Sequence, residues 1–417
     1  MQGLKKIAVK DLQQGMFLVK FEGNWLASPF WTSRFLIESV EDLRAAQGSG
    51  LRECWIDTTL GCDISKVAKP AAAPVAPPVP QAAPEAAAPC GPVIWNYTPA
   101  ASVPNTPLSF AEELRNADKL CNTARQSIVA MFSNVRVGKA IDTSVCRSLV
   151  DQIVGSVARH PGALISLSRL KSGDDYTYMH SVAVCALMVA LAQSMKLAPA
   201  DVHEAGLGGL LHDIGKAKIP TEILNKPGSL DEAEFATVKR HPEHGHELLL
   251  GGASARVLEI CLHHHERMDG AGYPSGQAGT GISLMARMAA VCDVYDAVTS
   301  NRPYKTGWDP ADALAKMISW KGHFDPAVLA AFIDVVGIYP TGSLVRLKSG
   351  LLAVVVEQNK AILTKPVVRV FYCTLTARTV PPVLVNLALE DAIAALEERE
   401  RWPAAALEAL WAGDLVR

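Results

Sequence analysis

One short stretch of this chain concentrates side chains that can bind metal ions. It runs from His263 to Pro274 and reads HHHERMDGAGYP, so three imidazoles and two carboxylates lead into a glycine-rich turn. Burying such a cluster is costly unless it has partners, because each unpaired polar group loses its hydrogen bonds with water. Imidazole nitrogen and carboxylate oxygen are donors that bind first-row transition metals. The stretch therefore indicates a metal centre.

Further potential ligands are spread over the sequence on both sides of this stretch. His212 and Asp213 are adjacent at the end of an apolar helical run, and neighbouring residues of a helix diverge by about 100°. Such a pair can contact two metal ions, or two sides of one. Asp293 follows the apolar run 288–292, where a carboxylate is costly unless it meets a metal or a cation. His180 and His241 add two imidazoles, although His180 in isolation would be interpreted as a hydrogen-bonded core residue.

Several motifs in a fixed order give the chain a family resemblance. They are His212-Asp213-x-x-Lys216, His241-Pro242-x-x-Gly245, His264-His265-Glu266-x-x-Asp269-Gly270-x-Gly272-Tyr273-Pro274, Asp293-x-x-Asp296 and Arg302-Pro303-Tyr304-Lys305. From His180 to Pro326 the chain closely resembles the HD-GYP family, a branch of the HD metal-dependent phosphohydrolases. Characterised members of that family hydrolyse the bacterial second messenger cyclic di-GMP. No P-loop, G-x-G-x-x-G cofactor motif or serine nucleophile pattern competes with this interpretation.

The resemblance implies a site for two divalent metal ions, which in this family are iron or manganese. Asp213 would bridge the two ions, and a hydroxide between them would attack phosphorus. Members with three metals carry an acidic residue one helical turn before the position of His180. This chain has Tyr176 there, so two ions are favoured. The implied ligands are His180, His212, Asp213, His241, His264, His265 and Asp293.

Cations of the motifs are predicted to handle the phosphate. Lys216 lies four residues after His212 on the same helical face, where it would neutralise a phosphate oxygen or hold the bridging aspartate. Asp213 and Lys216 are therefore the predicted catalytic residues. Arg302 and Lys305 resemble the phosphate-contacting pair of the family.

The remaining motif residues are predicted to shape the substrate loop or to support ligands. Gly272-Tyr273-Pro274 is expected to form a tight substrate-binding loop, in which the tyrosine either contacts a guanine or only shapes the turn. Glu266 and Asp269 are expected to orient ligands or to cap this turn, and Asp296 to support Asp293. A structural or exposed role is expected for the other imidazoles of these motifs, His244, His246 and His263.

The predicted function is hydrolysis of a 3′–5′ phosphodiester bond of cyclic di-GMP. The product would be linear pGpG, with GMP as the candidate product of a further step. Two alternatives stay open at this point. The chain could be a catalytically slow receptor that binds cyclic di-GMP and signals through partner proteins, although a pure receptor need not retain every metal donor. It could instead be a phosphohydrolase for another cyclic dinucleotide.

Charge, cysteine content and hydropathy limit the partners and the compartment. The chain has 417 residues and a formal net charge of −2, which gives no global attraction to DNA or to an anionic membrane. Nine cysteines occur without a C-x-x-C pair, and their odd number argues against a disulfide framework. No stretch reaches the ~18 uninterrupted apolar residues of a membrane span. The N-terminus has no apolar run typical of a signal peptide. A cytoplasmic protein without a membrane span is expected.

Changes in composition divide the sequence into four segments. Residues 1–66 are expected to form a small α+β domain, with strands at 7–9, 16–19 and 53–57 and a helix at 35–46. Residues 67–106 form an Ala/Pro-rich linker, because proline blocks helix and sheet alike. Residues 107–338 show helical periodicity almost throughout and are expected to form the phosphohydrolase domain. Residues 339–417 are expected to form antiparallel strands at 344–347, 352–356 and 367–372, followed by a helix at 389–399.

The predicted fold class is mainly α, with an HD-type helical bundle core, a small α+β N-terminal domain and a short C-terminal β-rich segment with a helix. The first core helix is expected from Ser109, a typical N-cap with Glu112 three residues on, to Asn134. Its apolar residues recur at alternating steps of three and four, which fits either packing on its own domain or a homodimer seam. The N-terminal domain resembles one often fused ahead of HD-GYP domains. It would be a folding or docking module, or a sensor that signals to partners.

Overall fold

The structure is a computed structural model that describes residues 4–22, 35–37, 43–44, 47, 53–62, 109–169, 176–226, 230–300, 307–359 and 361–413. The predicted linker at 67–106 lies outside the described residues. The chain forms two compact units, one from Met1–Thr98 with Ser229–Glu232 and the other from Pro99–Gly228 with Ala233–Arg417. The second unit contains every predicted metal ligand.

The N-terminal unit contains a four-stranded antiparallel sheet with the strand order β1-β4-β2-β3. The strands are β1 (Leu4–Ala8), β2 (Phe17–Glu22), β3 (Phe35–Leu36) and β4 (Glu53–Asp57), and the 3₁₀ turn η1 (Val9–Asp11) follows β1. Apolar residues from these elements form a small buried core that includes Ile7, Met16, Leu18, Cys54 and Ile56.

The helix predicted at 35–46 is wrong at its start. Phe35 and Leu36 form β3 and pair with residues 17–18 of β2. Pairing with a neighbouring strand thus overrides the local helical pattern, since strand formation depends on context. Among the described residues of this stretch, 43 and 44 are helical.

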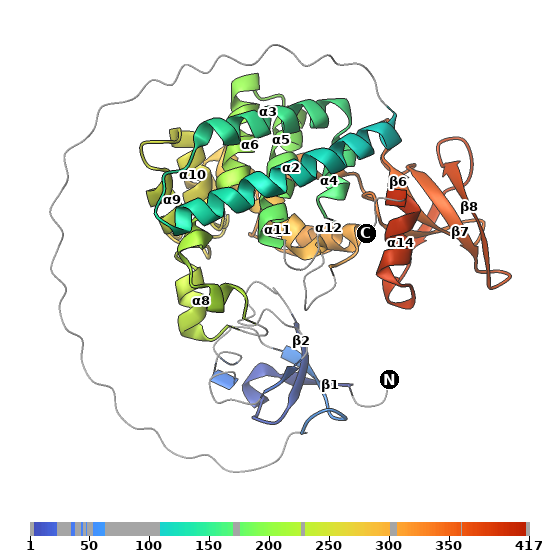
Figure 1. The fold of residues 1–417 in the computed structure, drawn as a ribbon. Coiled ribbons are helices and arrows are strands. Elements are labelled where there is room, and N and C mark those ends of the chain that lie inside the picture. The colour runs from blue at the N-terminus through green and yellow to red at the C-terminus, as the bar shows by residue number, and fades with distance from the viewer. Residues whose placement is uncertain are drawn as a thin grey trace. The chain divides into compact units, whose positions relative to one another are not determined.

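Helices make up most of the second unit (Figure 1). The α-helices up to residue 336 are α2 (Phe110–Arg136), α3 (Thr143–Arg159), α4 (Pro161–Leu167), α5 (Tyr176–Ser194), α6 (Pro199–Leu211), α7 (Thr221–Leu224), α8 (Glu232–Val238), α9 (His241–Leu249), α10 (Ala255–His263), α11 (Leu284–Thr299), α12 (Pro310–Ser319) and α13 (Pro326–Val336). The 3₁₀ turns η4 (Ile214–Lys218) and η5 (Gly279–Gly281) lie among them. This helical core confirms the predicted fold class.

Helix α5 lies at the centre of the bundle. Every residue from Val182 to Ala192 is buried, and α3, α6, α11 and α13 pack against the helix. A helix that is apolar on all sides must be covered on all sides. Within the described residues, one window, Thr177–Ser194, is long and apolar enough to cross a membrane, and 78% of it is buried inside the molecule.

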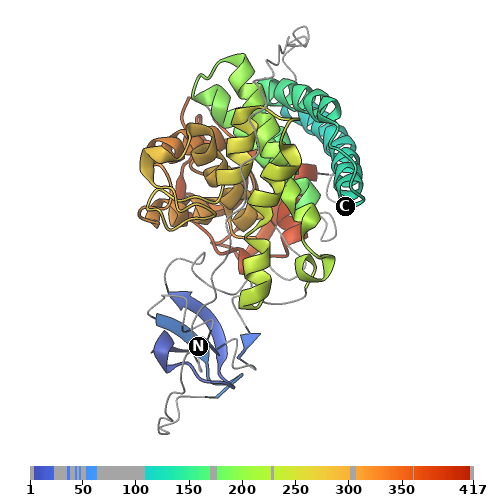
Figure 2. The same ribbon diagram turned by 90° about the vertical axis from the view of Figure 1, so that its left-hand side faces the viewer.

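Helix α2 lies along one side of the bundle (Figure 2). Ser109 and Glu112 form the predicted capping box, and the helix ends at Arg136, two residues beyond the predicted end. The apolar positions that recur along it are all buried in the chain's own fold: Leu114, Ala117, Cys121, Ala124, Ile128 and Met131. Packing on its own domain is therefore confirmed. A homodimer through this helix would have to use its exposed face.

Glu113 on α2 is fully buried and paired. Its carboxylate accepts hydrogen bonds from Ser156 Oγ at 2.7 Å and from Arg159 Nε and Nη2 at 2.8 and 3.0 Å. We expect Glu113→Ala to lower the free energy of unfolding of the helical unit by about 2–4 kcal/mol, because it leaves the guanidinium without its partner. Urea denaturation followed by circular dichroism measures the change. Arg115→Ala, at an exposed position of the same helix, is the control, and equal stability of the two variants would contradict the prediction.

The C-terminal segment is a five-stranded antiparallel sheet with the strand order β8-β7-β6-β5-β9. Its elements are β5 (Leu344–Leu347), β6 (Leu351–Glu357), β7 (Val367–Cys373), β8 (Arg378–Asn386), β9 (Ile393–Leu396), η6 (Arg399–Arg401) and α14 (Ala404–Ala412). The first three strands confirm the predicted ones. Helix α14 packs on β6.

Two features of this segment differ from the sequence prediction. The helix predicted at 389–399 is wrong, because β9 lies there and pairs with β5, with Leu396 opposite Val345. The final helix, α14, begins later. No strand was predicted where β8 lies. This strand contains Pro381 and Pro382 but is at the edge of the sheet, where the missing N–H groups are tolerated.

Polar contacts join this sheet to the helices. Asp309, at the start of α12, accepts a hydrogen bond from Leu344 N of β5 at 3.2 Å. Arg169 donates from Nη1 to Tyr295 Oη of α11 at 3.4 Å and from Nη2 to the carbonyl oxygen of Thr341. The guanidinium of Arg169 therefore joins the residues just before β5 to helix α11.

Candidate metal centre

The predicted metal ligands converge in the helical unit, and most of them lie where a helix begins or ends. They are His180 in α5, His212 and Asp213 directly after α6, His241 as the first residue of α9, His264 and His265 directly after α10, and Asp293 in α11. His265 is partly exposed, and the other six are buried.

Backbone carbonyl groups orient three of these imidazoles in the same way. The Nδ1 atoms of His212, His241 and His264 lie 2.8, 2.8 and 2.9 Å from the carbonyl oxygen three residues earlier. Such carbonyls near a helix end lack intrahelical partners. Because a carbonyl can only accept, Nδ1 carries the proton and Nε2 keeps a lone pair for a metal. His180 is held differently, with Nδ1 2.6 Å from Asp296 Oδ2.

The donor atoms form two groups. Within each group, the candidate ligand atoms lie within 4.8 Å of one another; the groups are His180, His212 and Asp213, and His241, His264 and His265. Asp213 faces both groups. Its Oδ2 lies 3.4 Å from His212 Nε2, whereas its Oδ1 lies 3.2 Å from His241 Nε2. One carboxylate oxygen directed at each group is the arrangement that a bridging ligand requires.

Two buried donor atoms in this centre lack a hydrogen bond. Neither Asp213 Oδ1 nor His212 Nε2 has a hydrogen-bond partner among the described residues. Buried polar atoms without a partner are rare and call for an explanation such as an ion. The set of imidazoles and carboxylates, without a thiolate, suits a divalent transition metal. The residues present therefore fit the metal ions that the sequence motifs imply.

Neighbouring cations and hydrogen bonds keep the carboxylates of the centre ionised. Burial by itself would raise the pKa of Asp213, but the charges of Lys216 and His212 outweigh it and hold the pKa well below its usual range. Burial also opposes ionisation of Asp293. The hydrogen bond from His180, at 2.9 Å, outweighs that effect and brings the pKa of Asp293 below its ordinary value. Ionised carboxylates are the form that binds metals.

Most of the imidazoles are held neutral. Burial lowers the pKa of His264, His265 and His241 from the ordinary histidine value. His212 is the exception: burial lowers its pKa, but the adjacent Asp213 charge outweighs burial and raises it. A metal ion competes with that proton, so binding at His212 should release it.

Lys216 contacts the predicted bridging carboxylate. Its Nζ lies 2.5 Å from Asp213 Oδ2. Helix α6 ends at Leu211, and Lys216 lies in the following 3₁₀ turn η4. The predicted shared α-helical face with His212 is therefore wrong. The contact with Asp213 is the geometry that the predicted role of holding this carboxylate requires.

The Gly-Tyr-Pro loop packs against one of the candidate ligands. The ring of Tyr273 stacks on His265 with centroids 4.7 Å apart and an interplanar angle of 29°. A Cβ on Gly272 would lie 2.5 Å from Arg267 N and from Glu266 Cα, so no side chain fits there. The Glu266 carboxylate accepts a hydrogen bond from Ser275 N at 2.7 Å. The loop is therefore held tightly beside the centre.

The predicted supporting residues have separate places. Asp269 accepts a hydrogen bond from Ala271 N at 3.0 Å, so it caps the turn like Glu266. Asp296 was expected to support Asp293. Its Oδ2 lies 2.6 Å from His180 Nδ1, and Asp293 Oδ1 lies 2.9 Å from the other ring nitrogen of His180, so the imidazole lies between the two carboxylates. Arg302 and Lys305, the predicted phosphate-contacting pair, lie outside the described residues.

Sequence reasoning missed how two glycines bring the motifs together. A Cβ on Gly215 would lie 1.9 Å from the carbonyl oxygen of His241 and 2.4 Å from Gly245 N. The backbone after Asp213 thus packs directly on the start of α9. The available signal was a glycine at a set distance after each histidine, in His212-x-x-Gly215 and His241-x-x-x-Gly245.

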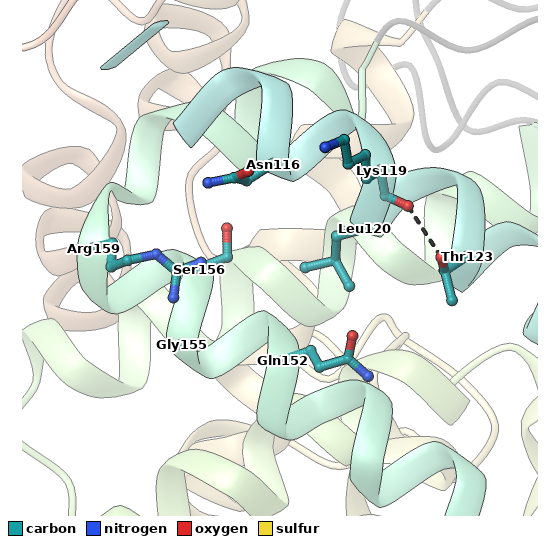
Figure 3. A pocket seen from close by; sticks show the side chains of 8 residues that line it. All are labelled: Asn116, Lys119, Leu120, Thr123, Gln152, Gly155, Ser156 and Arg159. Atoms are coloured by element: carbon teal, nitrogen blue, oxygen red, sulfur yellow. Dashed lines mark hydrogen bonds between the residues drawn. The ribbon is translucent and has the colours of Figure 1, made fainter. Parts of the chain in front are cut away.

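A separate hollow of about 290 Å³ lies between α2 and α3 (Figure 3). Its lining includes Lys119, Gln152 and Arg159, and none of the candidate metal ligands. Arg159 is already paired with Glu113. This hollow therefore does not compete with the convergent histidines as the reaction site.

Comparison with known proteins agrees with the site. The model of the HD domain family matches residues 156–328, and that of a domain of unknown function, DUF3391, matches residues 4–146. Cyclic di-GMP phosphodiesterase PA4108 of Pseudomonas aeruginosa is 48% identical over 416 residues, which are 98% of this chain and 96% of that protein. This chain belongs to the HD-GYP family. It is an enzyme, a phosphodiesterase, and the HD domain implies that it binds divalent metal ions.

Other relatives match a shorter part of the chain. The cyclic di-GMP phosphodiesterase response regulator RpfG of Xanthomonas campestris is 43% identical over 148 residues, 34% of this chain and 39% of that protein. 3′3′-cGAMP-specific phosphodiesterase 1 of Vibrio cholerae is 38% identical over 144 residues, 34% of this chain and 33% of that protein. Related chains thus carry names with different cyclic dinucleotides.

Proposed function

We propose that this HD-GYP protein hydrolyses cyclic di-GMP to linear pGpG, with GMP as the product of a second step. The observation that carries the proposal is the position of Asp213 between two groups of imidazoles, with one carboxylate oxygen near each. The full-length likeness to PA4108 supports the choice of substrate. Domain limits of 1–66, 67–106, 107–338 and 339–417 and a cytoplasmic location are part of the proposal.

His180, His212, Asp213 and Asp293 would hold one metal ion, and His241, His264 and His265 the other, with Asp213 shared. Bound divalent ions of this kind polarise a phosphoryl group and acidify water to a nucleophile at neutral pH. Imidazole and carboxylate donors without thiolate suit iron or manganese.

The protein's own residues would position the reacting groups. Lys216, at 2.5 Å from Asp213 Oδ2, holds that carboxylate in place and puts a positive charge beside the phosphate oxygens. Tyr273 stacks on His265, and Gly272, Tyr273 and Pro274 are proposed to contact a nucleotide base there. Arg302 and Lys305 are proposed to bind phosphate.

Turnover by the purified protein tests this function. The protein is reloaded with iron or manganese under reducing conditions, its metal content is measured, and cyclic di-GMP and 3′3′-cGAMP are supplied side by side. We expect faster cleavage of cyclic di-GMP, seen as pGpG by chromatography. Faster cleavage of 3′3′-cGAMP would assign the other substrate. Binding without cleavage by protein with confirmed metal would refute the enzymatic proposal and favour a receptor that signals through partner proteins.

A further inference from the structure

Lys239 places an ammonium group at the rim of the metal centre. The residue is exposed and lies between α8 and α9, two residues before His241. Its Nζ lies 4.7 Å from the centroid of the Phe235 ring and 5.5 Å from that of Tyr273. Both are cation–π distances. Because Tyr273 stacks on His265, a single aromatic ring separates this ammonium from a proposed metal ligand.

Lys239 differs from four other described cations of the helical unit, each of which is paired with a carboxylate. Those pairs are Lys216–Asp213 at 2.5 Å, Lys226–Glu234 at 2.6 Å, Arg240–Glu243 at 3.7 Å and Arg267–Asp269 at 2.5 Å. In the part of the chain that the structure describes, Lys239 forms no ion pair with a carboxylate. Its positive charge therefore remains available to an anionic ligand.

A cyclic dinucleotide carries two phosphodiester groups in one ring, and each bears a negative charge. When one of them occupies the metal centre, the other must lie a short distance away at the rim. The ammonium of Lys216 is taken by Asp213, so it does not serve the second group. We propose that Lys239 binds the second, non-reacting phosphodiester and thereby selects substrates that carry two phosphates. This inference rests on the proposed function and adds a specificity residue to it.

A purely structural role for Lys239 would be to hold Tyr273 in place through the cation–π contact. The two roles differ in what they predict for a substrate with only one phosphate. If Lys239 only held Tyr273 in place, its removal would let that ring move and would lower the turnover of every substrate. Loss of a phosphate-binding charge would affect only the substrate with the second phosphate.

The test compares kcat and KM for cyclic di-GMP with those for bis(4-nitrophenyl) phosphate, a diester with a single phosphate. The metal-loaded variants are Lys239→Met, which keeps an unbranched side chain but removes the ammonium group, and Lys239→Arg, which keeps the charge. Lys316→Met is the matched control, because Lys316 is also exposed and its Nζ lies 4.0 Å from the Trp308 ring centroid. KM is measured at two ionic strengths, since an exposed charge pair weakens with salt.

We expect Lys239→Met to raise KM for cyclic di-GMP about tenfold, as for a lost hydrogen bond to a charged group. The kcat should change little, and the ratio of kcat/KM between the two substrates should fall by a similar factor. Lys239→Arg should restore most of the affinity, and the salt dependence of KM should weaken in Lys239→Met. Equal losses for both substrates, or no change beyond that of Lys316→Met, would overturn the inference.

Failure of the proposed function would look different. Wild-type protein that cleaves bis(4-nitrophenyl) phosphate but no cyclic dinucleotide would refute the function. The role of Lys239 would then be judged from calorimetric binding of cyclic di-GMP, where weaker binding by Lys239→Met than by Lys316→Met supports it and equal binding overturns it.

Discussion

Replacement of Asp213 by asparagine should leave the protein folded but without the proposed binuclear centre. The neutral amide removes a charge that faces both groups of imidazoles, at 3.4 Å from His212 Nε2 and 3.2 Å from His241 Nε2. It also leaves Lys216 without its partner. We expect turnover to fall on the order of 10³-fold or more, because both metal binding and electrostatic stabilisation are lost. Metal content per chain, measured by plasma mass spectrometry, should fall from about two to below one.

Asp296→Asn is the matched control for that variant. Asp296 is equally buried and contacts His180 Nδ1 at 2.6 Å, but it orients a ligand and does not face both groups. Loss of such an orienting carboxylate typically lowers metal affinity or activity by about 10–100-fold. Asp213→Asn should therefore be clearly the more severe of the two. An Asp213→Asn protein that retains two metals and turnover would refute the bridging role.

The second large effect is expected from Gly215→Ala. The added methyl group would meet the carbonyl oxygen of His241 at 1.9 Å and Gly245 N at 2.4 Å. These are backbone atoms and cannot rotate away, so η4 must move from the start of α9. Asp213 and His241 would then separate. We expect a loss of at least about 3 kcal/mol in the free energy of unfolding, at the upper end for overpacking.

Gly281→Ala is the control for this steric effect, because a Cβ at Gly281 meets no atom within 4 Å. Thermal unfolding in the apo form separates packing from metal loss, and metal titration of the folded fraction then reports on the site. Equal melting temperatures for the two variants would show that the close approach of η4 and α9 is not needed.

The convergence of the candidate ligand residues could be predicted from the sequence because their chemistry is carried by side-chain type and order. Burying an imidazole or a carboxylate in a core costs free energy unless it has a partner. His212, Asp213 and His264 therefore indicated a metal site without any knowledge of distances. The pairing of Asp296 with His180 could not be predicted, because it depends on how α11 faces α5. The backbone carbonyls that bind the Nδ1 atoms of His212, His241 and His264 could not be predicted either, because any residue type supplies a carbonyl.

The elements that were predicted wrongly are those in which strand pairing outweighs local pattern. Residues 389–399 contain apolar residues at helical spacing, yet Leu396 pairs with Val345 because β5 offers an open edge. Strand β8 contains two adjacent prolines, which a strand tolerates at the edge of a sheet, where β8 lies. Helix α2 was predictable, since its cap and its apolar repeat agree with the packing that it finally adopts.

Arg169 connects the C-terminal segment to helix α11, which carries Asp293. Its guanidinium bonds both to Thr341, at the start of the strands, and to Tyr295, two residues after Asp293 on α11. A protein cut after Val336 would lose the Thr341 carbonyl that accepts from Arg169 and the Leu344 amide that donates to Asp309. The charged side chains of Arg169 and Asp309 would then each lack one of their hydrogen-bond partners. In such a fragment Arg169 would hold Tyr295 of α11 less firmly, so the metal affinity measured for the fragment would differ from that of the intact enzyme.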